Sequence, residues 1–416
     1  MNQHSTSRFY SQGHLQPHQA RLVEGEEARR RADARVVMAE QMNERLEGEV
    51  EEELGPRGER KAGTSGIWVC PRCATSLRAD FRRNGHYRRV IVTLVGPVTV
   101  RVPLIRCRCG KHVHIAWKTL VPRSRYWYDF ASQWERQYLA GSSYRKTAEL
   151  LSSLAGTQTS HMAGWRETQK AGAAARRVRQ ALECPKVVIL DEMYVWEKGS
   201  KKAVLLAIDP RGTILDFEGP TSRSAEHWRQ LLERLSERGV DPDHGLAYVV
   251  ADGDNAIRQA VEWVWGEAKV QHCVWHILMA IRAEAQRVCG EVSRSVTQIV
   301  EEARAVLMHQ ACTSETRQRA AERLAAFLKK HAGKPWAEIM ARCYTQATTY
   351  LLNSAVPCTN GTAERTIKEL RRRIKTMDGF KSHMGAKNLL AVLIQWHNWW
   401  RELPSTSKCT VSPSLP

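Results

Sequence analysis

Four short apolar segments between residues 187 and 251 constrain the fold of this chain most. They are VVILDEMYV (187–195), AVLLAI (203–208), TILDF (213–217) and LAYVVA (246–251). Their length and aliphatic, β-branched composition predict buried strands. Amphipathic helices are predicted over 224–238 and 255–265, around the last strand. Three strands followed by helix, strand and helix predict an α/β layer with a mixed sheet.

Length, charge and cysteine content limit the class of protein further. The 416 residues suit two to three domains, and a hydrophobic content of 43% excludes wholesale disorder. Lys and Arg exceed Asp and Glu by 63 − 44 = 19, which indicates a polyanionic partner. No apolar leader or run of eighteen apolar residues occurs, so neither secretion nor a membrane span is expected. Eleven cysteines in such a chain indicate thiols or metal ligands.

Shifts in composition divide the chain into six predicted parts. Residues 1–62 are predicted as a charged helical arm that is solvated, and residues 63–120 as a zinc-ribbon-like β segment with a hairpin split by Gly96-Pro97. Residues 121–182 are predicted as a helical DNA-binding region. Residues 183–276 and 351–403 form the predicted α/β core, which is interrupted by a helical insertion over 277–350. Residues 404–416 are predicted as a disordered tail.

Two cysteine pairs indicate a structural zinc site. Cys70 and Cys73 form a C-x-x-C, and Cys107 and Cys109 form a C-x-C at the far end of the predicted hairpin. Four thiolates complete a tetrahedral zinc shell, and a hairpin brings its ends together. His112 or His114 is an alternative ligand because the second pair is closely spaced. The other interpretation is four unrelated small apolar side chains.

The segment SYRKTAELLSSLAGTQTSHMAGWRETQKAG has the pattern of a helix-turn-helix. Tyr144, Ala148 and Leu151 form an apolar face, Gly156 suits the turn, and Thr159 or Ser160 suits the cap of the second helix. That helix would present four polar side chains to a DNA groove: His161, Arg166, Gln169 and Lys170. An ordinary α-hairpin in a helical domain is the alternative.

Three acidic residues stand at element ends where they can converge. Asp191 follows VVIL, Asp252 follows YVVA, and Glu364 begins a basic helix predicted over 363–376. Converging carboxylates repel one another, and a pair of Mg²⁺ ions about 4 Å apart removes this penalty and creates a site for phosphodiester chemistry. Taken alone, Asp252 could instead be a turn residue, and Asp191 could be the cap of a helix or turn. Their neighbours Glu192 and Asp254 are alternative ligands.

At four blocks the sequence resembles DDE transposases of bacterial insertion sequences, which have a Mutator-like RNase H-fold catalytic core. The blocks are VVILDEMYV, YVVADGDNAI, KVQHCVWHIL with its C-x-x-H, and TNGTAERTIKELRRRIKTMDGFKS with its N-x-x-x-E-R. The acids are 252 − 191 = 61 and 364 − 252 = 112 residues apart. The long second gap matches relatives with a helical insertion, and the resemblance covers about residues 185–400.

The resemblance implies metal-dependent cutting at the ends of a mobile element and joining of the freed 3′-hydroxyls to a target. Asp191, Asp252 and Glu364 would hold two Mg²⁺ (or Mn²⁺) ions. Cys273, His276 and Asn360 would lie near the active site. The DNA phosphates would contact the exposed side of the basic helix through Arg365, Lys368, Arg371, Arg372 and Lys375.

The expected partners are double-stranded DNA, as element ends and target, and further copies of the chain in a homodimer or higher oligomer. A cytoplasmic, nucleoid-associated bacterial protein is expected. Two other functions fit the same residues: a metal-dependent nuclease that does not transpose, and a DNA-binding regulator derived from a transposase. The predicted zinc segment and helix-turn-helix disfavour the first, and the presence of all three acids disfavours the second.

Overall fold

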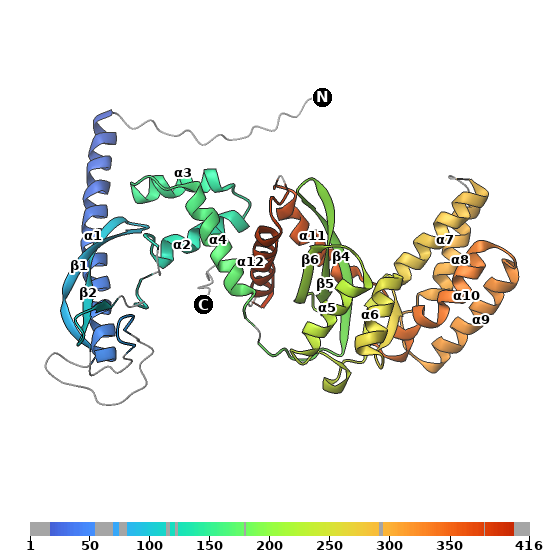
Figure 1. Cartoon of the computed structure of the whole chain (residues 1–416). Helices are drawn as coiled ribbons and strands as arrows, with labels where there is room; N and C mark the ends of the chain where they lie inside the picture. Colours follow the sequence, from blue (N-terminus) through green and yellow to red (C-terminus); the bar gives the residue numbers. More distant parts are fainter. Residues whose placement is uncertain are drawn as a thin grey trace, which may run out of the picture. The chain divides into compact units, whose positions relative to one another are not determined.

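The computed structural model describes residues 17–54, 70–74, 81–113, 117–120, 124–178, 180–290, 294–377 and 379–402 (Figure 1). These divide into two compact units. The first comprises the described residues up to Tyr138 together with Ser142–Glu167, and the second comprises Leu139–Gly141 and the described residues from Thr168 onward. The predicted tail 404–416 and the ends of the predicted arm, 1–16 and 55–62, lie outside the described residues.

A long hairpin dominates the first unit. Strands β1 (Phe81–Thr93) and β2 (Gly96–Cys107) pair antiparallel, with Thr93 opposite Gly96, which confirms the predicted hairpin. A third strand that the sequence analysis did not predict, β3 (His112–Val113), pairs with the end of β2. It was missed because two residues are too few to show an alternating pattern.

Helix α1 (Pro17–Leu54) packs against β2 (Figure 1). Met42, Leu46 and Val50 are at most 1% exposed and belong to the same hydrophobic core as the hairpin. The expectation of a solvated arm is therefore wrong for this part of the helix. A spacing of four residues places these three side chains on one stripe, which is sufficient to bury one face of an otherwise charged helix.

Three helices complete the described part of this region: α2 (Tyr128–Leu139), α3 (Tyr144–Ala155) and α4 (His161–Ala175). The predicted turn is present, since Gly156 adopts a left-handed conformation after α3 and the Ser160 hydroxyl accepts a hydrogen bond from the backbone of Met162. Leu151 is buried with Phe130 and Trp134 of α2. Residues 168–175 of α4 belong to the second unit.

A five-stranded mixed sheet organises the second unit. Its strands are β4 (Val187–Glu197), β5 (Ser200–Ile208), β6 (Ile214–Thr221), β7 (Tyr248–Ala251) and β8 (Lys269–His272), in the order β6-β5-β4-β7-β8. Strands β4, β5 and β6 are antiparallel, whereas β7 and β8 run parallel to β4. The four predicted strands and the mixed α/β sheet are confirmed. Strand β8 was not predicted, because KVQH contains a single aliphatic residue.

Helices cover both faces of this sheet (Figure 1). Helices α5 (Ala225–Ser236) and α6 (Asn255–Trp265) share a core with the even-numbered residues Val188 and Leu190 of β4. Side chains alternate along a strand, so the odd-numbered residues of β4 face the other side. There the chain supplies α11 (Gly361–Ile374), which contacts β4, and α12 (His383–Glu402), which contacts β6.

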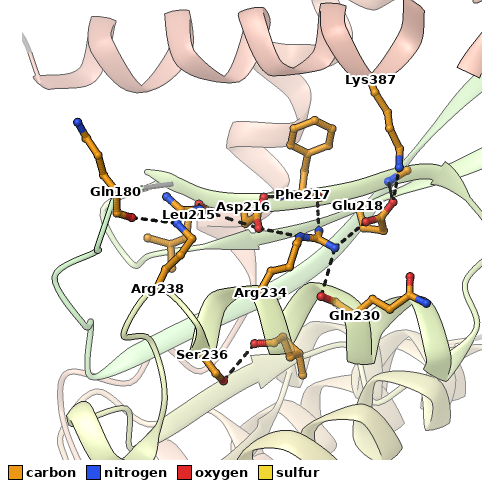
Figure 2. A network of polar contacts seen from close by, with 12 residues as sticks. Gln180, Leu215, Asp216, Phe217, Glu218, Gln230, Arg234, Ser236, Arg238 and Lys387 are labelled. Carbon is orange, nitrogen blue, oxygen red and sulfur yellow. Dashed lines mark hydrogen bonds and ion pairs between the residues drawn. The ribbon is translucent and has the colours of Figure 1, made fainter. Parts of the chain in front are cut away.

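The backbone of β6, at one edge of the sheet, is hydrogen-bonded by side chains as well as by β5. Arg234 of α5 and Arg238, which follows that helix, donate to the carbonyl oxygens of Phe217 and Leu215 at 2.9 and 3.0 Å (Figure 2). On the α12 side, Asn398 both donates to the carbonyl and accepts from the N–H of Ile214. The two arginines are held by ion pairs with Asp216 and, for Arg234, with Glu218.

The segment after β8 is helical, as predicted. It consists of α7 (Val274–Cys289), α8 (Arg294–Leu307), α9 (Ser314–Lys330) and α10 (Pro335–Ala347), which share one hydrophobic core. The short 3₁₀ helices η2 (Pro242–His244) and η3 (Thr349–Leu352) precede β7 and follow α10. In the described part of the chain, no helix has the length and apolar character needed to cross a bilayer.

Candidate active site

The register of the sheet places Asp191 and Asp252 at the same level. Strand β4 pairs with β7 through Val187–Tyr248, a sequence offset of 248 − 187 = 61. Continuing this offset beyond the last paired residues brings 191 + 61 = 252, so the two acids are level on adjacent parallel strands. Asp252 directly follows the buried strand YVVA, which ends at Ala251. The pairing therefore supports the predicted side-by-side placement of the two acids, but Asp191 lies inside β4, which continues to Glu197, and the expectation that it ends a strand is wrong.

Glu364 comes to the same place from α11. Ile367 and Leu370, one turn and two turns further on, are 4% exposed and hold this helix on the sheet. Glu364 lies in the first turn, exposed at the surface. It lines a cavity of about 560 Å³ together with Asp191. The helix thus presents one carboxylate to a concave surface while its apolar stripe is buried.

The electrostatics of Asp191 reflect this convergence. Burial raises its pKa to about 7, and the backbone N–H of Glu192 acts against this rise by donating to Oδ1 at 2.8 Å. The negative charges of Glu192, Asp252 and Glu364 raise the pKa further. The charges of three neighbouring carboxylates therefore act on Asp191 at this site.

The three acids do not form a closed ligand shell. Among the described residues, the one group with three or more possible ligand atoms all within 4.8 Å of one another is formed by cysteines. At least one pair of carboxylates among Asp191, Asp252 and Glu364 is thus farther apart than this distance. The three acids therefore belong to one site, but their carboxylate oxygens are not spaced as three ligands of one ion would be.

An arginine that sequence reasoning missed lies among these acids. Arg223, just before α5, forms ion pairs with Glu192 at 3.0 Å, Asp254 at 2.6 Å and Asp252 at 3.6 Å. Its Nη1 donates to the hydroxyl of Tyr194 at 3.2 Å. Nothing in the sequence TSRSAE marks this arginine, because its partners come from strand β4 and from the loop between β7 and α6.

The ion pairs of Arg223 also involve Glu192 and Asp254, the two predicted alternative metal ligands. Burial raises the pKa of Glu192 and Arg223 lowers it, while Asp252 and Asp254 raise it. Its Oε2 is buried and has no hydrogen-bond partner in the described part of the chain. Asp254 caps α6 by accepting from the N–H of Ala256. Both predicted alternative ligands are therefore already paired with Arg223.

Cys273 and Asn360 are buried beside Asp191. Asn360 Nδ2 donates to Asp191 Oδ2 at 2.9 Å, and the thiol of Cys273 donates to Asn360 Oδ1 at 3.1 Å. His276 lines the cavity with Glu364, and its buried Nδ1 has no hydrogen-bond partner among the described residues. All three predicted neighbours thus lie at the site of the acids.

The predicted phosphate contacts of α11 are all exposed. Four of them line the cavity with Asp191 and Glu364: Lys368, Arg371, Arg372 and Lys375. Arg365 is exposed as well. A basic wall next to an acidic cluster suits a polyanion that approaches bound cations.

The predicted groove-facing side chains of α4 divide into two sets. His161, Arg166 and Lys170 are exposed. Gln169 is not available, since its amide accepts from Asn388 and donates to the carbonyl of Gly385, both on α12. The expectation that Gln169 faces a groove is therefore wrong. Helix α4 packs too closely on α12 for this side chain to remain outside.

The four predicted zinc ligands converge at the end of the hairpin. The sulfurs of Cys70 and Cys109, and those of Cys73 and Cys107, are 3.6 Å apart, and all four lie within 4.8 Å of one another. A tetrahedron of zinc–sulfur bonds of about 2.3 Å has edges of about 3.8 Å, so this cluster can hold a metal ion such as zinc. His112 instead bonds with Asn84 at 2.9 Å, and His114 lies outside the described residues.

Comparisons with known proteins identify the family of this chain. The family model described as Transposase, Mutator family matches residues 70–402. The transposase for insertion sequence element ISRM5 of Rhizobium meliloti (strain 1021) is 31% identical over 257 residues, which are 59% of this chain and 58% of that protein. The transposase for insertion sequence element IS256 in transposon Tn4001 of Staphylococcus aureus is 24% identical over 211 residues, which are 48% and 52%. The chain therefore matches little more than half the length of these relatives. Because the family model extends over most of the sequence, this chain belongs to the Mutator family of transposases.

Proposed function

We propose that this chain cuts DNA at the ends of a mobile element and joins the freed 3′-hydroxyls to target DNA. One observation carries the proposal: a single cavity of about 560 Å³ has Asp191 and Glu364 on its wall together with Lys368, Arg371 and other basic side chains. Acidic ligands for cations and basic contacts for phosphates are the two components that phosphodiester chemistry requires. Family membership supports the same activity.

The donor set suits divalent cations. Asp191, Asp252 and Glu364 would hold two Mg²⁺ or Mn²⁺ ions, since carboxylate oxygens are the preferred ligands of these ions. Burial, and after it the negative charges of Glu192, Asp252 and Glu364, raise the pKa of Asp191, and bound cations would neutralise those charges. Cations bound there would lower the pKa of an attacking water or 3′-hydroxyl and stabilise the leaving oxygen. Arg223 would hold Asp252 and Glu192 apart from one another.

The topology supports an RNase H-like catalytic core. Three antiparallel strands are followed by two parallel ones, and the acids stand on the central strand β4, after β7 and on the covering helix α11. Helices α7 to α10 lie between the second and third acids in the sequence, as the proposed helical insertion would.

The exposed basic side chains supply the proposed DNA contacts. Arg365, Lys368, Arg371, Arg372 and Lys375 would bind phosphates beside the scissile bond, because they stand on the exposed side of the helix that carries Glu364. Arg166 and Lys170 of α4 would also contact DNA. A zinc ion on Cys70, Cys73, Cys107 and Cys109 would fix the end of the hairpin. Two copies of the chain would hold the two ends of an element together.

The test is strand cleavage of duplexes made from the DNA that borders the coding region, with Mg²⁺ present. Asp191→Asn and Asp252→Asn should abolish cleavage while duplex binding persists. Glu369→Gln is the matched control, because Glu369 lies on the same helix α11 but pairs with His397 at 3.2 Å. Cleavage by Asp191→Asn at the wild-type rate would refute the proposal.

A further inference from the structure

Asn360 occupies the N-cap position of α11 but does not cap the helix. An asparagine at this position ordinarily accepts a hydrogen bond from the second or third helical N–H, which stabilises the start of the helix. The Asn360 side chain makes no such bond. It is 1% exposed, so water does not satisfy it either. The amide is therefore committed to other partners.

Those partners are one residue of the proposed metal site and one thiol. The Nδ2 group donates to Asp191 Oδ2 at 2.9 Å, and Oδ1 accepts from Cys273 Sγ at 3.1 Å. The backbone N–H of Asn360 in turn donates to Cys273 Sγ at 3.4 Å. Because the thiol is the donor to Oδ1, it fixes which end of the amide faces Asp191. The reversed amide would set its carbonyl oxygen against a carboxylate oxygen.

The same contacts join the three segments that carry the acids. The N–H of Cys273 donates to the carbonyl of Ala251, the residue before Asp252, at 2.7 Å. The carbonyl of Asn360 accepts from the N–H of Glu364 at 3.1 Å. A buried amide and a buried thiol thus connect β4, the end of β7 and the first turn of α11.

We propose that Asn360 is a positioning residue that orients the Asp191 carboxylate for a divalent cation, and that Cys273 fixes the orientation of the Asn360 amide. Two N–H donors, from Asn360 and from the backbone of Glu192, hold the two oxygens of Asp191. Each oxygen keeps acceptor capacity for a ligand. The inference rests on the proposed function, because it takes Asp191 to be a metal ligand.

The first experiment measures Mn²⁺ affinity of the full-length chain by electron paramagnetic resonance. Asn360→Ala should weaken Mn²⁺ binding 10- to 100-fold, the usual effect of removing a residue that orients a metal ligand. In the Asp191→Asn background the same substitution should cause no further loss, because Asn360 acts through Asp191. Asn388→Ala is the matched control: Asn388 is a buried asparagine bonded to Gln169 and Arg176, remote from the acids in its contacts. It should lower stability and leave Mn²⁺ affinity unchanged.

A second set of variants separates positioning from folding. Asn360→Ser keeps a hydroxyl at this position, and thermal unfolding measured beside Mn²⁺ affinity should show a folded chain that has still lost Mn²⁺ affinity. Cys273→Ala should weaken Mn²⁺ binding, and Cys273→Ser, which retains a donor to Oδ1, should restore it. In cleavage assays the Asn360 variants should lower kcat and leave KM for duplex DNA unchanged.

The outcomes distinguish this inference from the proposed function. Wild-type Mn²⁺ affinity in Asn360→Ala and Asn360→Ser, with a loss in Asp191→Asn, would overturn the inference and leave the proposed function intact. Wild-type affinity in Asp191→Asn would overturn both. An additional loss on adding Asn360→Ala to Asp191→Asn would show that the asparagine acts through another group and would also overturn the inference.

Discussion

Gly253 offers a sharp test of how the site is built, because it directly follows Asp252 and has a φ of +85°. A Cβ at this position would lie 2.0 Å from Nε2 of His272. That nitrogen donates to the carbonyl oxygen of Asp252 at 2.7 Å. Gly253→Ala must therefore displace the imidazole and break the bond that fixes the Asp252 backbone.

The expected loss follows from two contributions. A left-handed backbone costs a non-glycine residue about 1–2 kcal/mol. Loss of the bond between His272 and Asp252 removes about 1 kcal/mol. Gly253→Ala should thus lower the free energy of unfolding by about 2–3 kcal/mol, and cleavage should fall because Asp252 moves. The matched control is Gly245→Ala, where φ is +108° and no atom lies within 4 Å of the added Cβ. It should lose the backbone contribution alone and keep cleavage.

Urea denaturation of the full chain measures these free energies. Adding His272→Ala to Gly253→Ala removes the steric overlap, so the double variant should be more stable than the sum of the two single losses predicts. Strict additivity, or wild-type stability of Gly253→Ala, would refute the reasoning.

Three further predictions concern other parts of the chain. Burial raises the pKa of Glu135 from its usual 4.5 to about 7, so the stability of the folded state should fall as pH rises from 4.5 to 7. Glu135→Gln should remove this pH dependence and stabilise the chain by about 1–3 kcal/mol at pH 8, measured by urea denaturation. Arg223→Ala leaves the buried Glu192 unpaired and should lower the free energy of unfolding by about 2 kcal/mol, with partial recovery in Arg223→Lys. Cys73→Ser should release zinc, measured by atomic absorption, and lower the Tm.

Each of these has an opposing outcome. An unchanged pH profile in Glu135→Gln would mean that this carboxylate is solvated in the folded chain. Equal stability of wild type and Arg223→Ala would mean that Glu192 is neutralised by another route. Identical zinc content in wild type and Cys73→Ser would remove the cysteine cluster as a zinc site.

The sequence predicts the elements that carry a dense local pattern and misses those that depend on distant partners. Four strands of the larger sheet were predictable because runs such as AVLLAI are apolar throughout. Strand β8 was not, since its pairing with β7 comes from the parallel ladder and not from KVQH itself. The packing of α1 was missed because three apolar residues among many charges, Met42, Leu46 and Val50, become a stripe only against β2.

The residues of the candidate site show the same difference between a local sequence pattern and distant partners. Asp191 and Asp252 were predictable because each directly follows a short apolar run, VVIL or YVVA, and Glu364 because it begins a basic amphipathic helix. Arg223 was not predictable, since its ion-pair partners are distant in the sequence. Glu192 is 223 − 192 = 31 residues away and Asp252 is 252 − 223 = 29 residues away. Gln169 was assigned outward because its contacts with α12 involve residues more than 200 positions away.

The side chains that hydrogen-bond β6 have a consequence for assembly. A sheet edge recruits a strand from another molecule when its backbone N–H and C=O groups are unsatisfied. The carbonyl groups of residues 214, 215 and 217 of β6 are already bonded by Asn398, Arg238 and Arg234, and Asn398 also accepts from the N–H of Ile214. An added strand would have to displace these side chains from residues 214–217 of β6, so this described part of the border is a poor template for β-augmentation by a second copy of the chain.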